Sequence, residues 1–340
     1  MGWCWVAMQW NLSSRTNNIE TCHLEHISWH GDALRIVFAK SKSDQTGEGM
    51  SNEKHVYPNP FKPEVCAIVS LAVYFFSGRS SQSHLPDTKL FQGTYQKTHW
   101  SDLLGEAVAM IDDNIDLGCQ KQDSKYIVMN FILEFSRLML RSLFIVGTHS
   151  IRKGSVTYLL SLLDGPSAIM VYLRAGWSLG NVPDRYIHAG TGSDQLVGRA
   201  IALLPLHSSD FAILGPHLKL DGIRYLAEVG WDSLVPGYSR YPGCFKNVIP
   251  YLIANLCHHY DWLNDNLPRN HPLWLHPLLS THFRHFQALK QWVTLGCNFN
   301  KETNMTATGI PGHVAMNTAL NDLKLKLQES NDLARIREQE

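Results

Sequence analysis

Strand signals in this chain are confined to one short stretch near the N-terminus, and helical signals dominate the rest of the sequence. Two strand-like segments, 23–30 and 33–40, flank Gly31-Asp32, a pair of residues typical of a tight β-hairpin turn. A third segment, 55–57, is rich in residues that favour strands and is followed by a proline. This distribution predicts a mainly α-helical protein with one small antiparallel β-sheet near its start, an α+β fold.

Apolar residues recur at helical spacing through much of the remaining chain. They predict helices over 3–20, 64–76, 98–112, 124–146, 150–163 and 167–174, and a short helix or turn over 181–188.

Changes in composition divide the chain into three regions. Residues 1–200 hold the hairpin and most of the helical segments, and we expect them to form one domain. Residues 201–312 are rich in Pro, Trp, Tyr and His and predict a separate helical C-terminal module. Residues 313–340 predict an amphipathic helix or short coiled-coil tail, because apolar residues alternate four and three positions apart as in a heptad seam: Met316, Leu320, Leu323 and Leu327.

The composition is that of a soluble globular protein, with 44% hydrophobic and 18% charged residues. The formal net charge of zero argues against a surface that binds nucleic acid everywhere, but it allows a local basic cleft. Seven cysteines without a CxxC pair favour free thiols in a reducing compartment. The most apolar stretch, 126–147, carries Glu134, Arg137 and Arg141, which favours a buried or interfacial helix over a membrane span.

One ordered set of residues matches the chemistry of cutting DNA without a metal. That reaction needs a nucleophile, cations that hold the non-bridging phosphate oxygens, a proton donor for the leaving oxygen and a base. Arginine suits the cationic role because its guanidinium group binds phosphate oxygens in a bidentate fashion. The set consists of Arg15, Lys42, His149, Arg152, Trp177 and Tyr186, in that order along the chain.

Each of these residues also has a simpler structural interpretation. Lys40 competes with Lys42 for the same role, and either lysine could serve only solubility in a polar loop. Trp177 could be an ordinary core aromatic residue. Tyr172 is an alternative nucleophile, but its position in an apolar helix favours burial. The joint order and spacing of the set, rather than any one member, points to function.

The same order resembles the catalytic signature of the tyrosine recombinase and integrase family. The resemblance covers about residues 10–200 and includes the His-x-x-Arg motif that begins at His149 and the interval of nine positions between Trp177 and Tyr186. The stretches Thr-His-Ser-Ile-Arg-Lys-Gly at 148–154 and Leu-Arg-Ala-Gly-Trp-Ser-Leu-Gly at 173–180 look most like recombinases of Crypton-type eukaryotic mobile elements.

The resemblance implies a role for each member of the set. Arg15 and Arg152 would grip the scissile phosphate, and Lys42 would protonate the leaving 5′ oxygen. His149 would assist proton transfer at the tyrosine, and the Trp177 indole would donate a hydrogen bond to phosphate. Tyr186 would become the covalent 3′-phosphotyrosine. We also expect three neighbouring basic residues to contact DNA: Lys40, Lys153 and Arg185.

The resemblance further implies double-stranded DNA as the partner, a nuclear location and, by analogy, several copies assembled on DNA. It implies neither a metal nor a nucleotide cofactor, and the chain contains no P-loop or dinucleotide fingerprint. The first catalytic arginine already stands at position 15, so we expect the N-terminal core-binding domain of the family to be absent. Two alternatives stay open: a domesticated or decayed relative that binds DNA or protein without cutting, and an enzyme that relaxes DNA like a type IB topoisomerase.

Histidine is abundant enough to raise the question of a metal site. His23, His26 and His30 lie in a segment predicted to be a strand, where the first two would face opposite sides and could not converge on one ion. The histidines between 258 and 285 match no zinc-binding spacing. We therefore predict structural roles for them.

Overall fold

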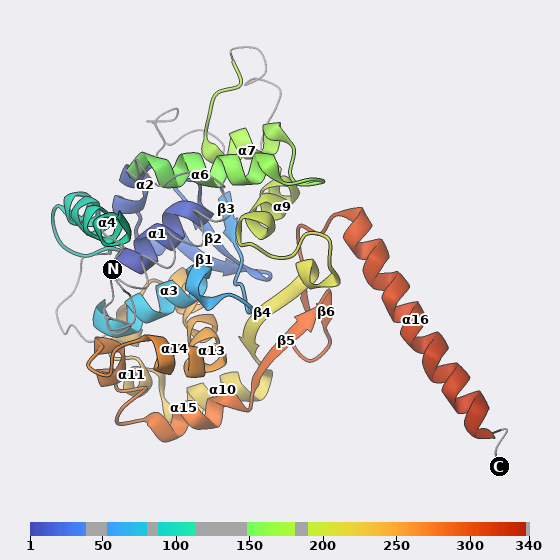
Figure 1. Cartoon of the computed structure of the whole chain (residues 1–340). Helices are drawn as coiled ribbons and strands as arrows, with labels where there is room; N and C mark the ends of the chain where they lie inside the picture. Colours follow the sequence, from blue (N-terminus) through green and yellow to red (C-terminus); the bar gives the residue numbers. More distant parts are fainter. Residues whose placement is uncertain (39–52, 80–87, 113–147, 181–189, 338–340) are drawn as a thin grey trace.

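The computed structural model describes residues 1–38, 53–79, 88–112, 148–180 and 190–337. Helices dominate these ranges, as the sequence predicts (Figure 1). The α-helices are α1 Gly2–Asn11, α2 Thr16–Glu20, α3 Ala67–Tyr74, α4 Gln96–Asp112, α6 Thr148–Ser161, α7 Ala168–Ala175, α9 Thr191–Ile201, α10 Leu220–Val229, α11 Trp231–Leu234, α12 Gly243–Lys246, α13 Ile249–His258, α14 Tyr260–Asn266, α15 Phe283–Lys290 and α16 Gly312–Arg337.

The predicted sheet near the N-terminus is confirmed. Strands β1 (Ile27–His30), β2 (Ala33–Val37) and β3 (Glu53–Val56) form an antiparallel sheet in that order. Gly31 occupies the β1–β2 turn with φ of +59°, a conformation that glycine adopts without steric cost. The sheet places β3, which lies far from β1 in the chain, beside the hairpin.

A second antiparallel sheet lies within the region predicted as a helical C-terminal module. It contains β4 (Ile213–Leu218), β5 (Val293–Cys297), β6 (Phe299–Asn300) and β7 (Met305–Thr306). The region 201–312 contains helices α10 to α15 as well as this sheet, which the sequence did not indicate. These strands escaped prediction because β4 contains glycine and proline, β6 and β7 are only two residues long, and β4 finds its partner across a long stretch of chain.

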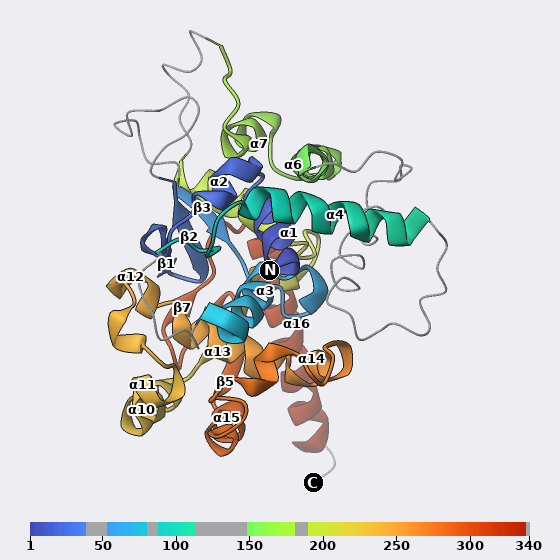
Figure 2. The same cartoon turned by 90° about the vertical axis from the view of Figure 1, so that its left-hand side faces the viewer.

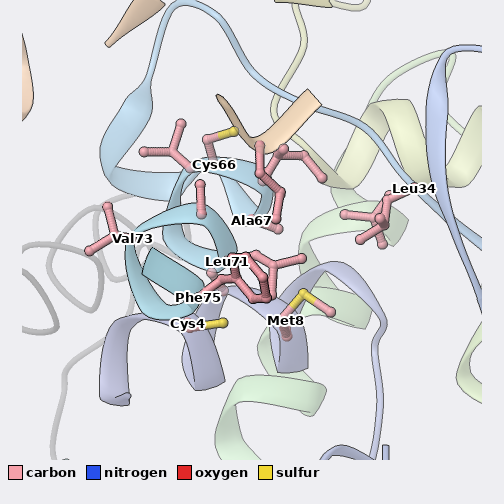
Figure 3. Packing of buried hydrophobic residues seen from close by; sticks show 14 of the residues in the cluster. Cys4, Met8, Leu34, Cys66, Ala67, Leu71, Val73 and Phe75 are labelled. Atoms are coloured by element: carbon pink, nitrogen blue, oxygen red, sulfur yellow. The ribbon is translucent and has the colours of Figure 1, made fainter. Parts of the chain in front are cut away.

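The core is organised around α1, which is buried on every side. A helix without a polar face belongs in the interior of a protein. Cys4 and Met8 on α1 face Leu71 on α3, and the neighbouring Phe75 completes this part of the core (Figure 3). The end of this central helix leads directly into the connection that carries Arg15.

Contacts join segments from both sides of position 200. The Trp10 indole donates a hydrogen bond to the Ile201 carbonyl at 3.1 Å. The Trp29 and Tyr251 rings stack with their centroids 3.7 Å apart. The buried Asp32 carboxylate accepts a hydrogen bond from the Thr308 hydroxyl at 2.6 Å. These contacts connect α1, β1 and the turn between β1 and β2 with later parts of the chain.

The helix α16 extends away from the rest of the described chain (Figures 1 and 2). Its apolar seam residues are all exposed: Met316, Leu320, Leu323 and Leu327. None of the helices in the described ranges is both long enough and apolar enough to cross a membrane.

Candidate functional site

The first predicted catalytic residue lies in the short connection between α1 and α2. Ser13 adopts φ of +46°, a left-handed conformation that is uncommon for residues other than glycine. The connection thereby turns sharply, and Arg15 follows in an extended conformation as the residue before α2. Arg15 is half-buried and lies just beyond the end of the central helix α1.

The helix α6 carries three of the predicted residues on different faces. His149 and Lys153 are exposed, whereas Arg152 is only 7% exposed. Ser155 is also buried, and its hydroxyl donates to the Ser13 hydroxyl at 3.1 Å. This hydrogen bond ties the arginine-bearing face of α6 to the connection that holds Arg15.

Arg152 and Arg15 lie close enough to interact electrostatically. Burial, and next the positive charge of Arg15, lower the pKa of Arg152 to about 10. Arg152 donates through Nη2 to the Ala175 carbonyl, while its buried Nε has no hydrogen-bond partner in the described part of the chain. The two arginines, more than a hundred positions apart in the sequence, therefore lie within electrostatic range of each other.

Trp177 contacts the same arginine. It follows Gly176, which ends α7 in a left-handed conformation with φ of +65°. The Arg152 guanidinium carbon lies 5.7 Å from the centre of the Trp177 ring, a cation–π distance. The indole is 37% exposed rather than buried in the core. Tyr172 packs edge-on against it at 5.2 Å.

Lys54 on β3 is a third cation at this place, and it was not among the residues predicted from the sequence. Its Nζ donates to the Leu12 carbonyl at 2.9 Å and to the Ser14 hydroxyl at 3.4 Å, so it contacts the same connection as Arg15. Lys54 pairs with the buried Ile36 across the sheet, and this cross-strand position turns it inward. A shift of one residue in the strand pairing would turn Lys54 to the opposite face of the sheet. The sequence of so short a strand does not reveal this register without the partner strand.

The environment of Lys54 disfavours its charge. Burial, and next the charge of Arg174, lower the pKa of Lys54 to about 7, with smaller contributions from Arg152 and Arg15. Only Asp194 opposes this shift among the major influences. That carboxylate is already engaged: it lies 2.6 Å from Nη1 of Arg174 and 3.0 Å from Nδ1 of His55.

Arg15, Lys54 and Arg152 together form a cluster that we call the cation cluster. None of its members forms an ion pair with a carboxylate in the described ranges. Burying like charges together costs free energy unless an anion compensates them. The cluster lies where α6 and α7 approach α2 and β3 at one end of the molecule (Figures 1 and 2).

The other predicted site residues lie outside the described residues: Lys40, Lys42, Arg185 and Tyr186. The roles assigned to them stay predictions.

The histidines near β1 have local structural contacts. The backbone N–H of His23 donates to Nδ1 of His26 at 3.1 Å, and Nδ1 of His23 lies 2.7 Å from the Thr88 hydroxyl. In the part of the chain covered by the structure, no three His, Cys, Asp or Glu side chains are grouped so that they could hold a metal ion.

Comparisons of the chain with models of known protein families, with curated proteins and with solved structures give no match.

Proposed function

We propose that this protein cleaves and rejoins DNA strands through a covalent phosphotyrosine, as tyrosine recombinases do. The observation that carries the proposal is the cation cluster: Arg15, Lys54 and Arg152 lie together without a carboxylate partner among the described residues. Such a cluster suits a phosphodiester, which would supply the missing negative charge. The ordered motifs of the sequence supply the remaining groups.

The proposed reaction consists of two transesterifications. The Tyr186 oxygen attacks phosphorus, its O–P bond forms, and the bond from phosphorus to the 5′ oxygen breaks. The phenol proton passes to a base, for which His149 is our candidate, and the leaving oxygen takes a proton from a general acid. A 5′ hydroxyl then attacks the phosphotyrosine and reverses the sequence. One phosphodiester is exchanged for another, so the reaction needs no nucleotide energy source.

Lys54 adds a second candidate for the general acid. We assigned that role to Lys42, which lies outside the described residues. Lys54 contacts the arginine-bearing connection directly, and a pKa near 7 suits a group that gives up a proton at neutral pH. We propose that Lys54 holds the connection that carries Arg15 in place and adds positive charge to the cation cluster. We also propose Lys54 as an alternative to Lys42 for the proton donor.

Double-stranded DNA is the partner that this proposal requires. Nuclear residence and the assembly of several copies on DNA belong to the same proposal.

A binding protein without cleavage activity is the second candidate, and the environment of Arg152 favours it. That guanidinium is buried and already donates to the Ala175 carbonyl. The Arg152 guanidinium can therefore hold α6 against α7 without binding a phosphate.

A nicked suicide DNA substrate distinguishes the two candidates, because the short strand released by cleavage diffuses away and traps the covalent adduct. We expect the wild-type protein to form an adduct that survives denaturing electrophoresis, and Tyr186→Phe to form none. Tyr172→Phe is the matched control, since it removes a nearby phenol hydroxyl and should leave the adduct intact.

The outcomes separate cleanly. An adduct that persists in Tyr186→Phe shows that another residue is the nucleophile. DNA binding by the wild-type protein without any adduct supports the binding protein. The absence of both rules out the proposed function.

A further inference from the structure

A pocket of about 460 Å³ is lined by residues that the proposed function leaves unused. Its lining comes from β1, β4, α10, α11, α12 and α13 and from the segment before β7. The elements β1, α10, α11 and α12 lie along one side of the molecule (Figure 2). Small-molecule sites typically occupy about 300–1,000 Å³, so the volume suits a ligand of modest size.

Two stacked aromatic pairs form much of the wall. Trp29 and Tyr251 stack at 3.7 Å with an interplanar angle of 8°. Trp231 and Tyr238 stack at 4.7 Å with an angle of 13°. All four rings line the pocket and none is fully buried. Flat aromatic surfaces of this kind bind a planar ring by stacking, a contact worth about 1–3 kcal/mol for a nucleobase.

Among the described residues that line the pocket, Lys246 is the one with a charged side chain. Its Nζ donates to the Ser239 carbonyl at 2.9 Å and lies 5.4 Å from the centre of the Tyr238 ring. An ammonium group has three donors, so two of them remain for a ligand. The pocket therefore offers a positive charge next to an aromatic stack.

The polar side of the pocket has a fixed hydrogen-bond pattern. Nδ1 of the buried His217 lies 2.8 Å from the Gly215 carbonyl, which can only accept, so Nδ1 carries the proton. Nε2 must then accept, and both the Thr303 hydroxyl at 3.0 Å and Nδ2 of Asn300 at 3.3 Å donate to it. Burial lowers the pKa of His217 and favours this neutral form. The Thr303 oxygen is left with lone pairs that can accept a hydrogen bond from a ligand.

We propose that this pocket binds a nucleotide: a planar base stacked on the aromatic wall, with its phosphate at Lys246 and a ring or sugar donor at Thr303. The lining disfavours a quaternary ammonium ligand, because the Lys246 ammonium would repel it and no carboxylate among the described lining residues offsets that charge. It also disfavours a wholly apolar ligand, which would leave the Lys246 ammonium desolvated without a partner.

The test is calorimetric titration of the full-length protein with 5′-AMP, adenosine and inorganic phosphate. We expect AMP to bind saturably, adenosine to bind about tenfold more weakly because it lacks the charge, and phosphate alone to bind weaker still. This comparison uses only the wild-type protein, so it decides the matter even where a variant fails to fold. Saturable binding of none of the three overturns the proposal.

Variants assign the binding to the pocket. Lys246→Met should reduce AMP affinity to that of adenosine, and Trp231→Ala should weaken both ligands at least about tenfold. The matched controls are Lys290→Met, which removes a lysine 4.1 Å from the Tyr260 ring elsewhere in the protein, and Trp274→Ala. Equal effects of the control and pocket variants, or AMP affinity unchanged in Lys246→Met, overturn the proposal.

A short single-stranded oligonucleotide identifies the source of the nucleotide. Competition between the oligonucleotide and AMP, with the same sensitivity to Trp231→Ala, assigns the pocket to a base of a DNA strand. Binding of AMP alone assigns it to the free nucleotide. Tyr186→Phe should leave both measurements unchanged, so this proposal and the proposed function can fail independently.

Discussion

Lys54 shows how a single buried charge links stability to pH. Burial lowers the pKa of Lys54 from 10.5 to about 7 in the folded protein, while the unfolded chain keeps the ordinary value. Between these values the unfolded state binds more protons than the folded state. The free energy of unfolding therefore rises with pH across this window, by at most about 1.4 kcal/mol per pH unit for this group.

We predict that Lys54→Met removes this pH dependence. Urea denaturation at several values between about pH 7 and about pH 10 should show a difference between wild type and variant that grows in favour of the wild type as pH rises. Lys153→Met, the substitution of an exposed lysine on α6, is the control and should leave the wild-type slope in place. A wild-type-to-Lys54→Met difference that stays constant over this range would mean that Lys54 keeps its proton in the folded state.

The packing of α9 on β3 is the contact between elements that places Lys54 and Asp194. Gly198 faces β3 so closely that an added Cβ would overlap the His55 backbone oxygen and contact the Tyr57 ring. We predict that Gly198→Ala destabilises the protein by about 1–3 kcal/mol, because the helix must move away from the strand. Gly192→Ala in the same helix is the matched control: a Cβ there meets nothing within 4 Å.

Denaturation curves for the two variants should move in opposite directions. Gly192→Ala should stabilise the protein by up to about 1 kcal/mol through helix propensity. Equal destabilisation by both substitutions would point to a general effect of alanine in α9 rather than to its contact with β3.

Sequence reasoning succeeded at the scale of elements where the signal was local. The hairpin β1–β2 was predictable because Gly31 marks its turn and the strands adjoin it. The helix predicted over 3–20 divides in two because Ser13 takes a left-handed conformation, which a serine in the sequence does not indicate. The sheet β4–β7 was not predictable, since β4 and β5 pair across an interval filled with helices.

The candidate site shows the same division between local and distant information. The motif that contains His149 and Arg152 can be recognised in the sequence, because both residues lie close together on one helix. The approach of Arg15 to Arg152 could be expected only through resemblance to a family. Lys54 could not be found in this way, because its inward position depends on its pairing with Ile36 on β2.

At the scale of the whole molecule, one buried ion pair connects the first sheet to much later segments. The Arg199 guanidinium contacts Asp32 and donates from Nη1 to the Phe211 and Ile213 carbonyls at 2.8 and 3.0 Å. Asp32 in turn accepts from the Thr308 hydroxyl at 2.6 Å. Removing one partner of a buried pair leaves the other charge uncompensated, at a cost of about 3–5 kcal/mol.

We predict that the wild-type chain unfolds in one transition and that Arg199→Met lowers its midpoint by an amount that corresponds to this cost. Tryptophan fluorescence and far-ultraviolet circular dichroism should report the same midpoint during urea denaturation. Arg35→Met is the control, because its ion pair with Glu53 is about a third exposed and is worth at most about 1 kcal/mol. Two separate wild-type transitions would instead support a domain boundary at position 200. In that case the hydrogen bonds of Arg199 to the Phe211 and Ile213 carbonyls would belong to the interface between independently folding units, and Arg199→Met should separate their transitions further.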